Sequence, residues 1–235
     1  YVTKSKQHKE LNMHTRNFLF GLLVILAAAG CGKKEPDAIK IGAILPLTGD
    51  GAKYGESAQK GIELALEEIN AGGGIQGKRI VVIYEDSKGD PKTGVSAVQK
   101  LISVERVPAI IGDLFSSVTL AVAPLMNQNK VVLLSSASSS PKITTAGDYI
   151  FRNVASDVFE GSIMADFALK QLKLRKLAIL YINNEYGVGV KDVFKDRFLS
   201  QGGTITSEEG FQQGSVEFKA QLAKTKATNP DAIYI

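Results

Sequence analysis

Two short serine-rich segments have the chemistry to bind an anion. Residues 114–117 (LFSS) and 137–141 (ASSSP) each follow a short apolar run and offer hydroxyl groups and backbone amides. In an open parallel sheet, ligands bind beyond the carboxyl ends of the strands, where helix N-termini present free N–H groups. Such donors suit a carboxylate, so we predict that both segments converge on a single carboxylate group of a ligand. A plain N-cap role for Ser116 is the simpler alternative.

Catalysis by the common nucleophilic triads is excluded for most of the chain. Both histidines (His8 and His14) and the one cysteine (Cys31) lie within the first 31 residues. Ser-His-Asp and Cys-His mechanisms need these side chains, and a thiolate zinc site needs several cysteines. We therefore predict a protein that is not an enzyme, with no catalytic residues, no metal and no cofactor.

The charge distribution disfavours a nucleic-acid partner. The formal net charge is +4, but residues 1–38 contain six Lys/Arg and three acids, which leaves only +1 for residues 39–235. Affinity for nucleic acid depends on clustered Lys/Arg that neutralise phosphates. The main part of the chain has no basic stripe, so we predict no nucleic-acid binding.

The first 38 residues have the pattern of an export leader. A basic start precedes twelve apolar residues, 18–29 (FLFGLLVILAAA), which are short of the roughly 20 needed to span a bilayer core. Residues 28–32 (AAGCG) resemble a bacterial lipobox, with Ala28 where leucine is usual. We predict that residues 1–30 are removed, that Cys31 is lipidated and that residues 31–38 form a tether. An ordinary signal peptide with an incidental cysteine is the alternative.

From residue 39 onward, apolar strands alternate with amphipathic helices. Such a pattern is typical of parallel sheets covered on both faces. The predicted strands are 39–46, 79–86, 107–112, 131–135, 176–182, 204–211 and 231–235. The predicted helices are 55–71, 91–105, 116–129, 157–172, 186–201 and 216–227. Residues 141–156 are expected to contain no helix and to connect two Rossmann-like α/β lobes, 39–153 and 156–235, of which the second is incomplete.

Seven segments in order resemble the type I periplasmic binding proteins, in particular the branched-chain amino-acid-binding receptors of ABC transporters. They are 41–57 (IGAILPLTGDGAKYGES), 69–80 (INAGGGIQGKRI), 85–91 (EDSKGDP), 110–125 (IIGDLFSSVTLAVAPL), 135–144 (SSASSSPKIT), 151–157 (FRNVASD) and 183–189 (NNEYGVG). The resemblance implies an extracytoplasmic protein, anchored only by lipid, that passes an amino acid to transporter permease subunits. It also implies a longer polypeptide, because the family places another aromatic and an acidic ammonium partner beyond residue 235.

The resemblance also implies ligand-binding residues. In the family, the two serine-rich loops hold the ligand carboxylate, which corresponds to Ser116 on the first loop and to Ala137, Ser138 and Ser139 on the second. The second-loop serines could equally be plain loop residues. Two further residues, Tyr54 and Tyr186, match positions that line or face the cleft, and both would contact the ligand. Asp157 lies just past the passage between the lobes, a position from which it would face the ligand ammonium group. Alternatively, Tyr54 is an exposed loop residue and Asp157 an acid at a helix N-terminus.

Other functions remain open within the same fold. A sensory ligand-binding lobe would pass its signal to a receptor, although it would need a spanning helix that a lipobox does not provide. A binder of amides, urea or aromatic acids would differ only in its ligand. A dinucleotide enzyme is disfavoured, because residues 46–48 separate the glycines of 49–55 from the strand. In a dinucleotide-binding motif, an acidic residue is expected about 20 residues after the glycines, whereas Glu85 and Asp86 lie about 35 residues after them.

Overall fold

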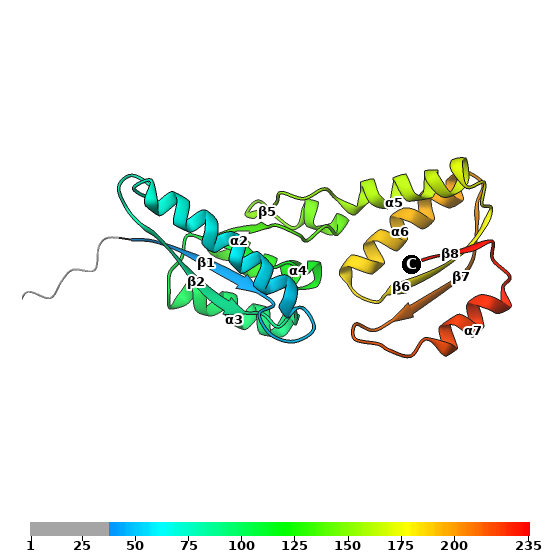
Figure 1. Ribbon diagram of the computed structural model, residues 1–235, viewed down its shortest axis with the longest axis horizontal. Helices are drawn as coiled ribbons and strands as arrows, with labels where there is room; N and C mark the ends of the chain where they lie inside the picture. The colour runs from blue at the N-terminus through cyan, green and yellow to red at the C-terminus, as the bar shows by residue number, and fades with distance from the viewer. Residues whose placement is uncertain (1–37) are drawn as a thin grey trace, which may run out of the picture. The chain divides into compact units, whose positions relative to one another are not determined.

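The computed structural model describes residues 38–235 (Figure 1). The expected leader of residues 1–30, the lipidation site Cys31 and the tether up to residue 37 lie outside the described residues. None of the helices within residues 38–235 is both long and apolar enough to cross a bilayer.

The first sheet has five parallel strands in the order β2-β1-β3-β4-β5. The strands are β1 (Ile39–Leu45), β2 (Ile80–Asp86), β3 (Ala109–Gly112), β4 (Val132–Ser135) and β5 (Ile150–Arg152). The connections are α2 (Ala52–Ala71), α3 (Pro91–Ser103), α4 (Ser116–Asn129) and the 3₁₀ helix η1 (Pro141–Thr145). Helices α3 and α4 pack on one face of this sheet, where Leu101, Val122 and Met126 are buried against Ile110. Because every strand is parallel, all the carboxyl ends meet at one edge.

The second sheet has three parallel strands in the order β7-β6-β8. The strands are β6 (Lys176–Ile182), β7 (Thr204–Phe211) and β8 (Ala232–Tyr234). The helices are α5 (Asp157–Asp166), which continues into the π-helical turn η2 (Phe167–Gln171), α6 (Glu185–Ser200) and α7 (Lys219–Ala227). Phe194 of α6 stacks on Tyr234 of β8 with ring centroids 3.8 Å apart, which joins α6 to the sheet.

Polar residues fix the starts of two helices that follow strand ends. Asp90 caps α3 by accepting a hydrogen bond from the Thr93 N–H at 2.8 Å. Asn184 caps α6 by accepting from the N–H groups of Tyr186 and Gly187 at 3.1 and 2.9 Å. An Asn or Asp side chain at this position satisfies N–H groups that the helix itself leaves unpaired. The cap on α6 fixes the first turn of the helix, which carries Tyr186.

The prediction that residues 141–156 contain no helix is wrong. The segment contains the 3₁₀ helix Pro141–Thr145 and the strand Ile150–Arg152, which pairs with β4. The link between the sheets is therefore shorter, at residues 153–156. The α/β fold class with parallel sheets is confirmed, and no strand within residues 38–235 pairs across the two sheets. The lobe boundaries near residues 153 and 156 stay a proposal that this separation supports.

Candidate functional site

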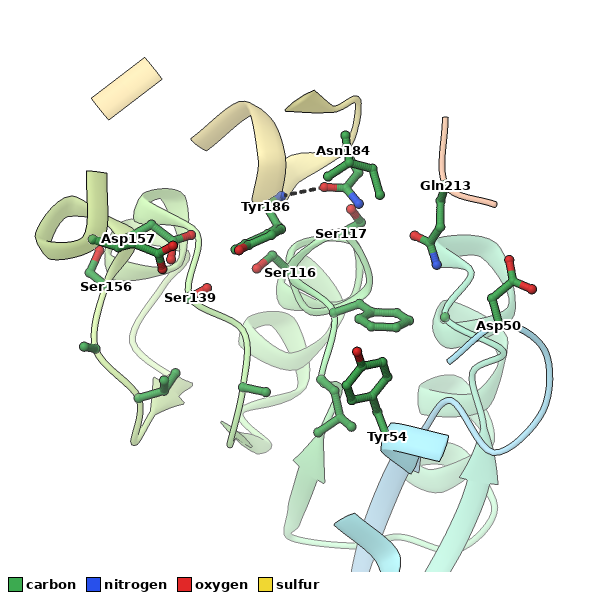
Figure 2. A pocket seen from close by; sticks show the side chains of 18 of the residues that line it. Asp50, Tyr54, Ser116, Ser117, Ser139, Ser156, Asp157, Asn184, Tyr186 and Gln213 are labelled. Atoms are coloured by element: carbon green, nitrogen blue, oxygen red, sulfur yellow. Dashed lines mark hydrogen bonds between the residues drawn. The ribbon is translucent and has the colours of Figure 1, made fainter. Parts of the chain in front are cut away.

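A cavity of about 730 Å³ lies at the carboxyl ends of the strands (Figure 2). Its lining comes from the segments that follow each of the strands β1 to β7 and from the starts of α2, α4, α5 and α6, so both sheets contribute to it. Six of the seven predicted ligand-binding residues line it: Tyr54, Ser116, Ala137, Ser139, Asp157 and Tyr186. Ser138 does not.

The N-terminus of α4 presents backbone donors to the cavity. The N-cap is Phe115, which has no side-chain cap, and the N–H groups of Val118 and Thr119 both bond to the Phe115 carbonyl at 3.0 Å. The N–H groups of Ser116 and Ser117, which both line the cavity, therefore have no partner within the helix. Ser116 is not the N-cap, so the plain capping role is wrong and the helix end is open to an anion.

The two serine-rich loops are joined to each other beside the cavity. The buried Ser116 hydroxyl accepts a hydrogen bond from the Ser140 N–H at 3.2 Å. The Ser139 carbonyl accepts from the Asp157 N–H at 3.0 Å, and the Ser139 side chain also bonds the Asp157 carboxylate. The loops after β3 and β4 and the start of α5 thus meet at one place, as the sequence predicted for the two loops.

Asp157 places a carboxylate in this cavity with one oxygen unpaired. Its side chain is 2% exposed, and Oδ2 has no hydrogen-bond partner in the described part of the chain. Burial raises the pKa of the Asp157 carboxyl and Glu160 adds to the rise, while the Ser139 bond and Arg152 oppose it. An unpaired buried carboxylate oxygen is costly, so a cationic or hydrogen-bonding ligand group is favoured there.

Two tyrosines enter the cavity from different helices. Tyr186, in the first turn of α6, lies beside Ser116 in Figure 2, and burial with the charges of Glu160 and Asp157 raises its pKa. Tyr54, in the first turn of α2, is 68% exposed yet lines the cavity. Each can cover an apolar ligand surface while offering a hydroxyl group.

Comparison with known proteins identifies the family. The sequence model of the family described as periplasmic binding protein matches residues 38–235. The chain belongs to this family. Leu/Ile/Val-binding protein homolog 3 of Brucella melitensis is 32% identical over 217 residues, which cover 92% of this chain and 59% of that protein. The chain thus spans somewhat more than half the length of this relative.

Two solved structures that resemble this chain have a small molecule bound. The branched-chain amino acid transporter substrate-binding protein LivJ of Streptococcus pneumoniae, in complex with isoleucine, is 32% identical with a TM-score of 0.75. A solute-binding protein of an ABC transporter from Rhodopseudomonas palustris, in complex with 3,4-dihydroxybenzoic acid, is 31% identical with a TM-score of 0.75. Each match covers 84% of this chain, and 56% and 53% of the respective structures.

Ser138 has a different position from the one that the family resemblance predicts. Its side chain is buried behind the loop, 3.0 Å from the carbonyl oxygen of Asp113 and 2.8 Å from the Thr119 hydroxyl. The Ser138 hydroxyl therefore makes its hydrogen bonds within the protein and does not reach the cavity. In the ASSS run only Ala137 and Ser139 line the cavity.

Three lining residues of this periplasmic binding protein, Ile182, Asp50 and Glu160, were not predicted from sequence. Ile182 forms an apolar wall with Leu114 and Phe115 of the predicted loop 114–117, while Asp50 and Glu160 add negative charge. Ile182 is the last residue of β6, so its strand-end position was the available signal. Glu160 stands one helical turn beyond Asp157, and that spacing places both acids on one face of α5.

The cavity lining is acidic. Asp50, Asp157 and Glu160 contribute carboxylates, and no Lys or Arg of the described residues lines the cavity. Within the same residues, no group of three His, Cys, Asp or Glu side chains could hold a metal ion. The arrangement offers backbone N–H donors at one point and carboxylate acceptors at another.

Proposed function

We propose that the chain is the larger part of an extracytoplasmic substrate-binding protein that captures an α-amino acid for an ABC transporter. One observation carries the proposal: the open N-terminus of α4 lines the same cavity as the unpaired Asp157 oxygen. The helix end suits a carboxylate and Asp157 suits an ammonium group. A zwitterion supplies both groups on one small molecule.

The ligand side chain in this proposal is apolar. Leu114, Phe115 and Ile182 line the cavity together with the rings of Tyr54 and Tyr186. Burial of a branched aliphatic side chain against such a wall contributes roughly 1.5–3 kcal/mol. Leucine, isoleucine and valine fit this chemistry, in agreement with the names of the relatives.

An aromatic acid is the second candidate, because a relative of similar identity has 3,4-dihydroxybenzoic acid bound. Such a ligand has a carboxylate and no cation. Asp157, Glu160 and Asp50 would repel it without compensation from a basic side chain in the described lining. The charge of the cavity therefore favours the amino acid.

Calorimetric titration of the full chain tests the choice of ligand. We expect leucine to bind, isovalerate (the acid without the ammonium group) to bind far more weakly, and 3,4-dihydroxybenzoate not to bind. Asp157→Asn should reduce leucine affinity by about thirtyfold or more, since loss of one partner of a buried charge pair costs about 2–5 kcal/mol. The same change should leave isovalerate affinity unchanged or improved.

The matched control is Asp148→Asn, which changes an exposed acid outside the cavity. It should leave every affinity unchanged. Tight binding of the aromatic acid with no response to leucine would replace the amino-acid proposal with the aromatic one.

The proposal includes a location and two partners. The lobes 39–153 and 156–235 would close on the ligand, and the closed form would dock on permease subunits at the outer face of the cytoplasmic membrane. Cys31 would carry the lipid that holds the protein there. Mass spectrometry of protein isolated from bacterial membranes should find a lipid-modified Cys31 as the first residue; an unmodified cysteine or an intact leader would reject the anchor.

A further inference from the structure

Asp113 is a buried carboxylate directly behind the cavity that does not line it. Its side chain is 0% exposed, and it lies between the end of β3 and the start of α4. Burial raises the pKa of the Asp113 carboxyl to about 6, although bonds from Ser87 and from the N–H groups of Phe115 and Leu114 oppose the rise. Packing alone does not require a carboxylate here, because an apolar side chain would avoid its desolvation.

The Asp113 carboxylate fastens two loops that line the cavity. It accepts hydrogen bonds from the Phe115 N–H at 2.8 Å and from the Ser87 hydroxyl. The Ser87 hydroxyl itself accepts from the Gly89 N–H at 3.2 Å. Phe115 and Gly89 both line the cavity, so one carboxylate holds the loops after β2 and β3.

The Asp113 backbone carbonyl holds a third loop, the one that follows β4. It accepts from the hydroxyls of Ser135 and Ser138 at 2.6 and 3.0 Å, and from Thr119 at 3.3 Å. The Ser135 hydroxyl also accepts from the Ser138 N–H at 3.0 Å. The loop after β4, which carries Ala137 and Ser139, is thereby tied to the residue that holds the other two loops.

We infer that Asp113 is the positioning residue of the anion-binding point, which it serves without touching the ligand. Its carboxylate accepts hydrogen bonds from the N–H groups of Leu114 and Phe115. The N–H groups of Ser116 and Ser117 thereby stay available to the ligand carboxylate. Its carbonyl sets the loop after β4 beside them. Donors held in place before binding need no reordering when the ligand arrives, which raises affinity. The ligand part of this inference rests on the proposed function.

Hydrogen–deuterium exchange on the ligand-free protein tests the positioning without any ligand. Asp113→Leu removes the carboxylate and keeps the carbonyl, so it should speed exchange in peptides that cover 87–89 and 114–117. Asp113→Asn, which keeps one acceptor oxygen for the Phe115 N–H, should stay near wild type. The control is Asn70→Ala, which removes two hydrogen bonds to Ile80 at the opposite edge of the same sheet. It should leave both loop peptides unchanged. Unchanged loop peptides in Asp113→Leu would overturn the inference.

Binding of leucine and of leucinamide supplies the second readout, because only the acid uses the anion-binding point. Asp113→Leu should lower the affinity for leucine by about tenfold, which corresponds to the loss of one charge-assisted hydrogen bond. It should lower the affinity for leucinamide by less than about threefold. Ser135→Ala, which removes a hydrogen bond to the Asp113 carbonyl, should weaken leucine binding by about threefold and leucinamide binding by less. This variant decides the test if Asp113→Leu does not fold. Equal losses for acid and amide would overturn the inference. If wild type binds neither compound, the amino-acid proposal fails, while the exchange result still decides the role of Asp113.

Discussion

At the scale of single residues, the hydroxyl of Ser116 has a structural partner as well as a place in the cavity. It is 3% exposed and accepts from the Ser140 N–H. A buried N–H without an acceptor costs about 1–3 kcal/mol. The side chain therefore links two loops, and its removal affects the folded protein before any ligand is present.

Ser116→Ala should lower the free energy of unfolding by about 1–3 kcal/mol, because the Ser140 N–H loses its acceptor. Urea denaturation measures this change. The control is Ser57→Ala in α2, where an exposed hydroxyl donates only to the Lys53 carbonyl within the same helix. We expect less than about 0.5 kcal/mol for the control. Equal, small effects at both positions would show that the link contributes nothing.

The ionisation of Asp113 should make the protein less stable as the pH rises. Its pKa is about 6 in the folded state, against about 3.9 in an unfolded chain. Between these values the folded state keeps a proton that the unfolded state has released, so the free energy of unfolding falls from about pH 4 to about pH 6. The fall levels off at on the order of 3 kcal/mol.

Denaturation of wild type and Asp113→Asn across this pH range isolates the contribution. Asparagine does not titrate, so the stability of Asp113→Asn relative to wild type should increase between about pH 4 and pH 7. The two curves would run parallel if Asp113 kept its ordinary pKa.

Much of the site was predictable from residue types and loop positions, and one part was not. Strand ends and hydroxyl groups indicated Ser116 and Ser139, since ligand positions in parallel sheets follow from topology. The inward turn of Ser138 and the role of Asp113 depend on the hydrogen bonds that join three loops far apart in sequence. No local pattern encodes such partners.

At the scale of elements, each sheet has a glycine where the helix that follows its first strand approaches the end of that strand. A Cβ at Gly55 of α2 would lie 2.1 Å from the Pro46 carbonyl oxygen just after β1. A Cβ at Gly187 of α6 would lie 2.1 Å from the Ile182 carbonyl oxygen at the end of β6. The glycines let each helix begin close to its strand, which brings Tyr54 and Tyr186 to the cavity.

Gly187→Ala should destabilise the protein, because the methyl group meets backbone that cannot move aside. We expect a loss of roughly 1–3 kcal/mol in urea denaturation. Gly61→Ala in α2 is the control, since nothing lies within 4 Å of its added Cβ. That change should stabilise by about 0.5–1 kcal/mol through helix propensity. A neutral or stabilising Gly187→Ala would show that α6 can shift freely.

Long periodic elements were predictable, whereas short ones were not. The helix at 116–129 and the strands at 176–182 and 204–211 are confirmed with their predicted bounds. The three-residue strand Ile150–Arg152 has too few residues to show an alternation, and its pairing with β4 defines it. The 3₁₀ helix Pro141–Thr145 is likewise too short for a helical period.

At the scale of the folded unit 39–235, the two sheet regions touch beside the cavity through η1, α4 and α6. Lys142 of η1 forms an ion pair with Glu185 of α6 at 2.8 Å, and the Glu185 N–H donates to the Ser117 hydroxyl at 3.3 Å. Both charged side chains are well exposed, so the ion pair contributes at most about 1 kcal/mol. Close packing at Gly189 is the stricter constraint, because a Cβ there would lie 2.8 Å from the Pro141 ring.

Gly189→Ala should weaken ligand binding by about fivefold or more, because the methyl group pushes α6 away from η1. The free energy of unfolding should change little or rise, since alanine favours the helix. Calorimetry and urea denaturation on the same samples separate the two effects. Unchanged affinity in Gly189→Ala would show that this contact is not made when the ligand is bound.

The two cavity tyrosines have a spectroscopic consequence. The chain contains no tryptophan, so no indole emission masks the fluorescence of Tyr54 and Tyr186. An indole introduced at Phe159, which also lines the cavity, would be the only one in the chain. Its emission maximum would move to shorter wavelength as a ligand displaces water from the cavity. In a Phe159→Trp variant, the proposed ligand binding could therefore be tested optically in real time, without a dye.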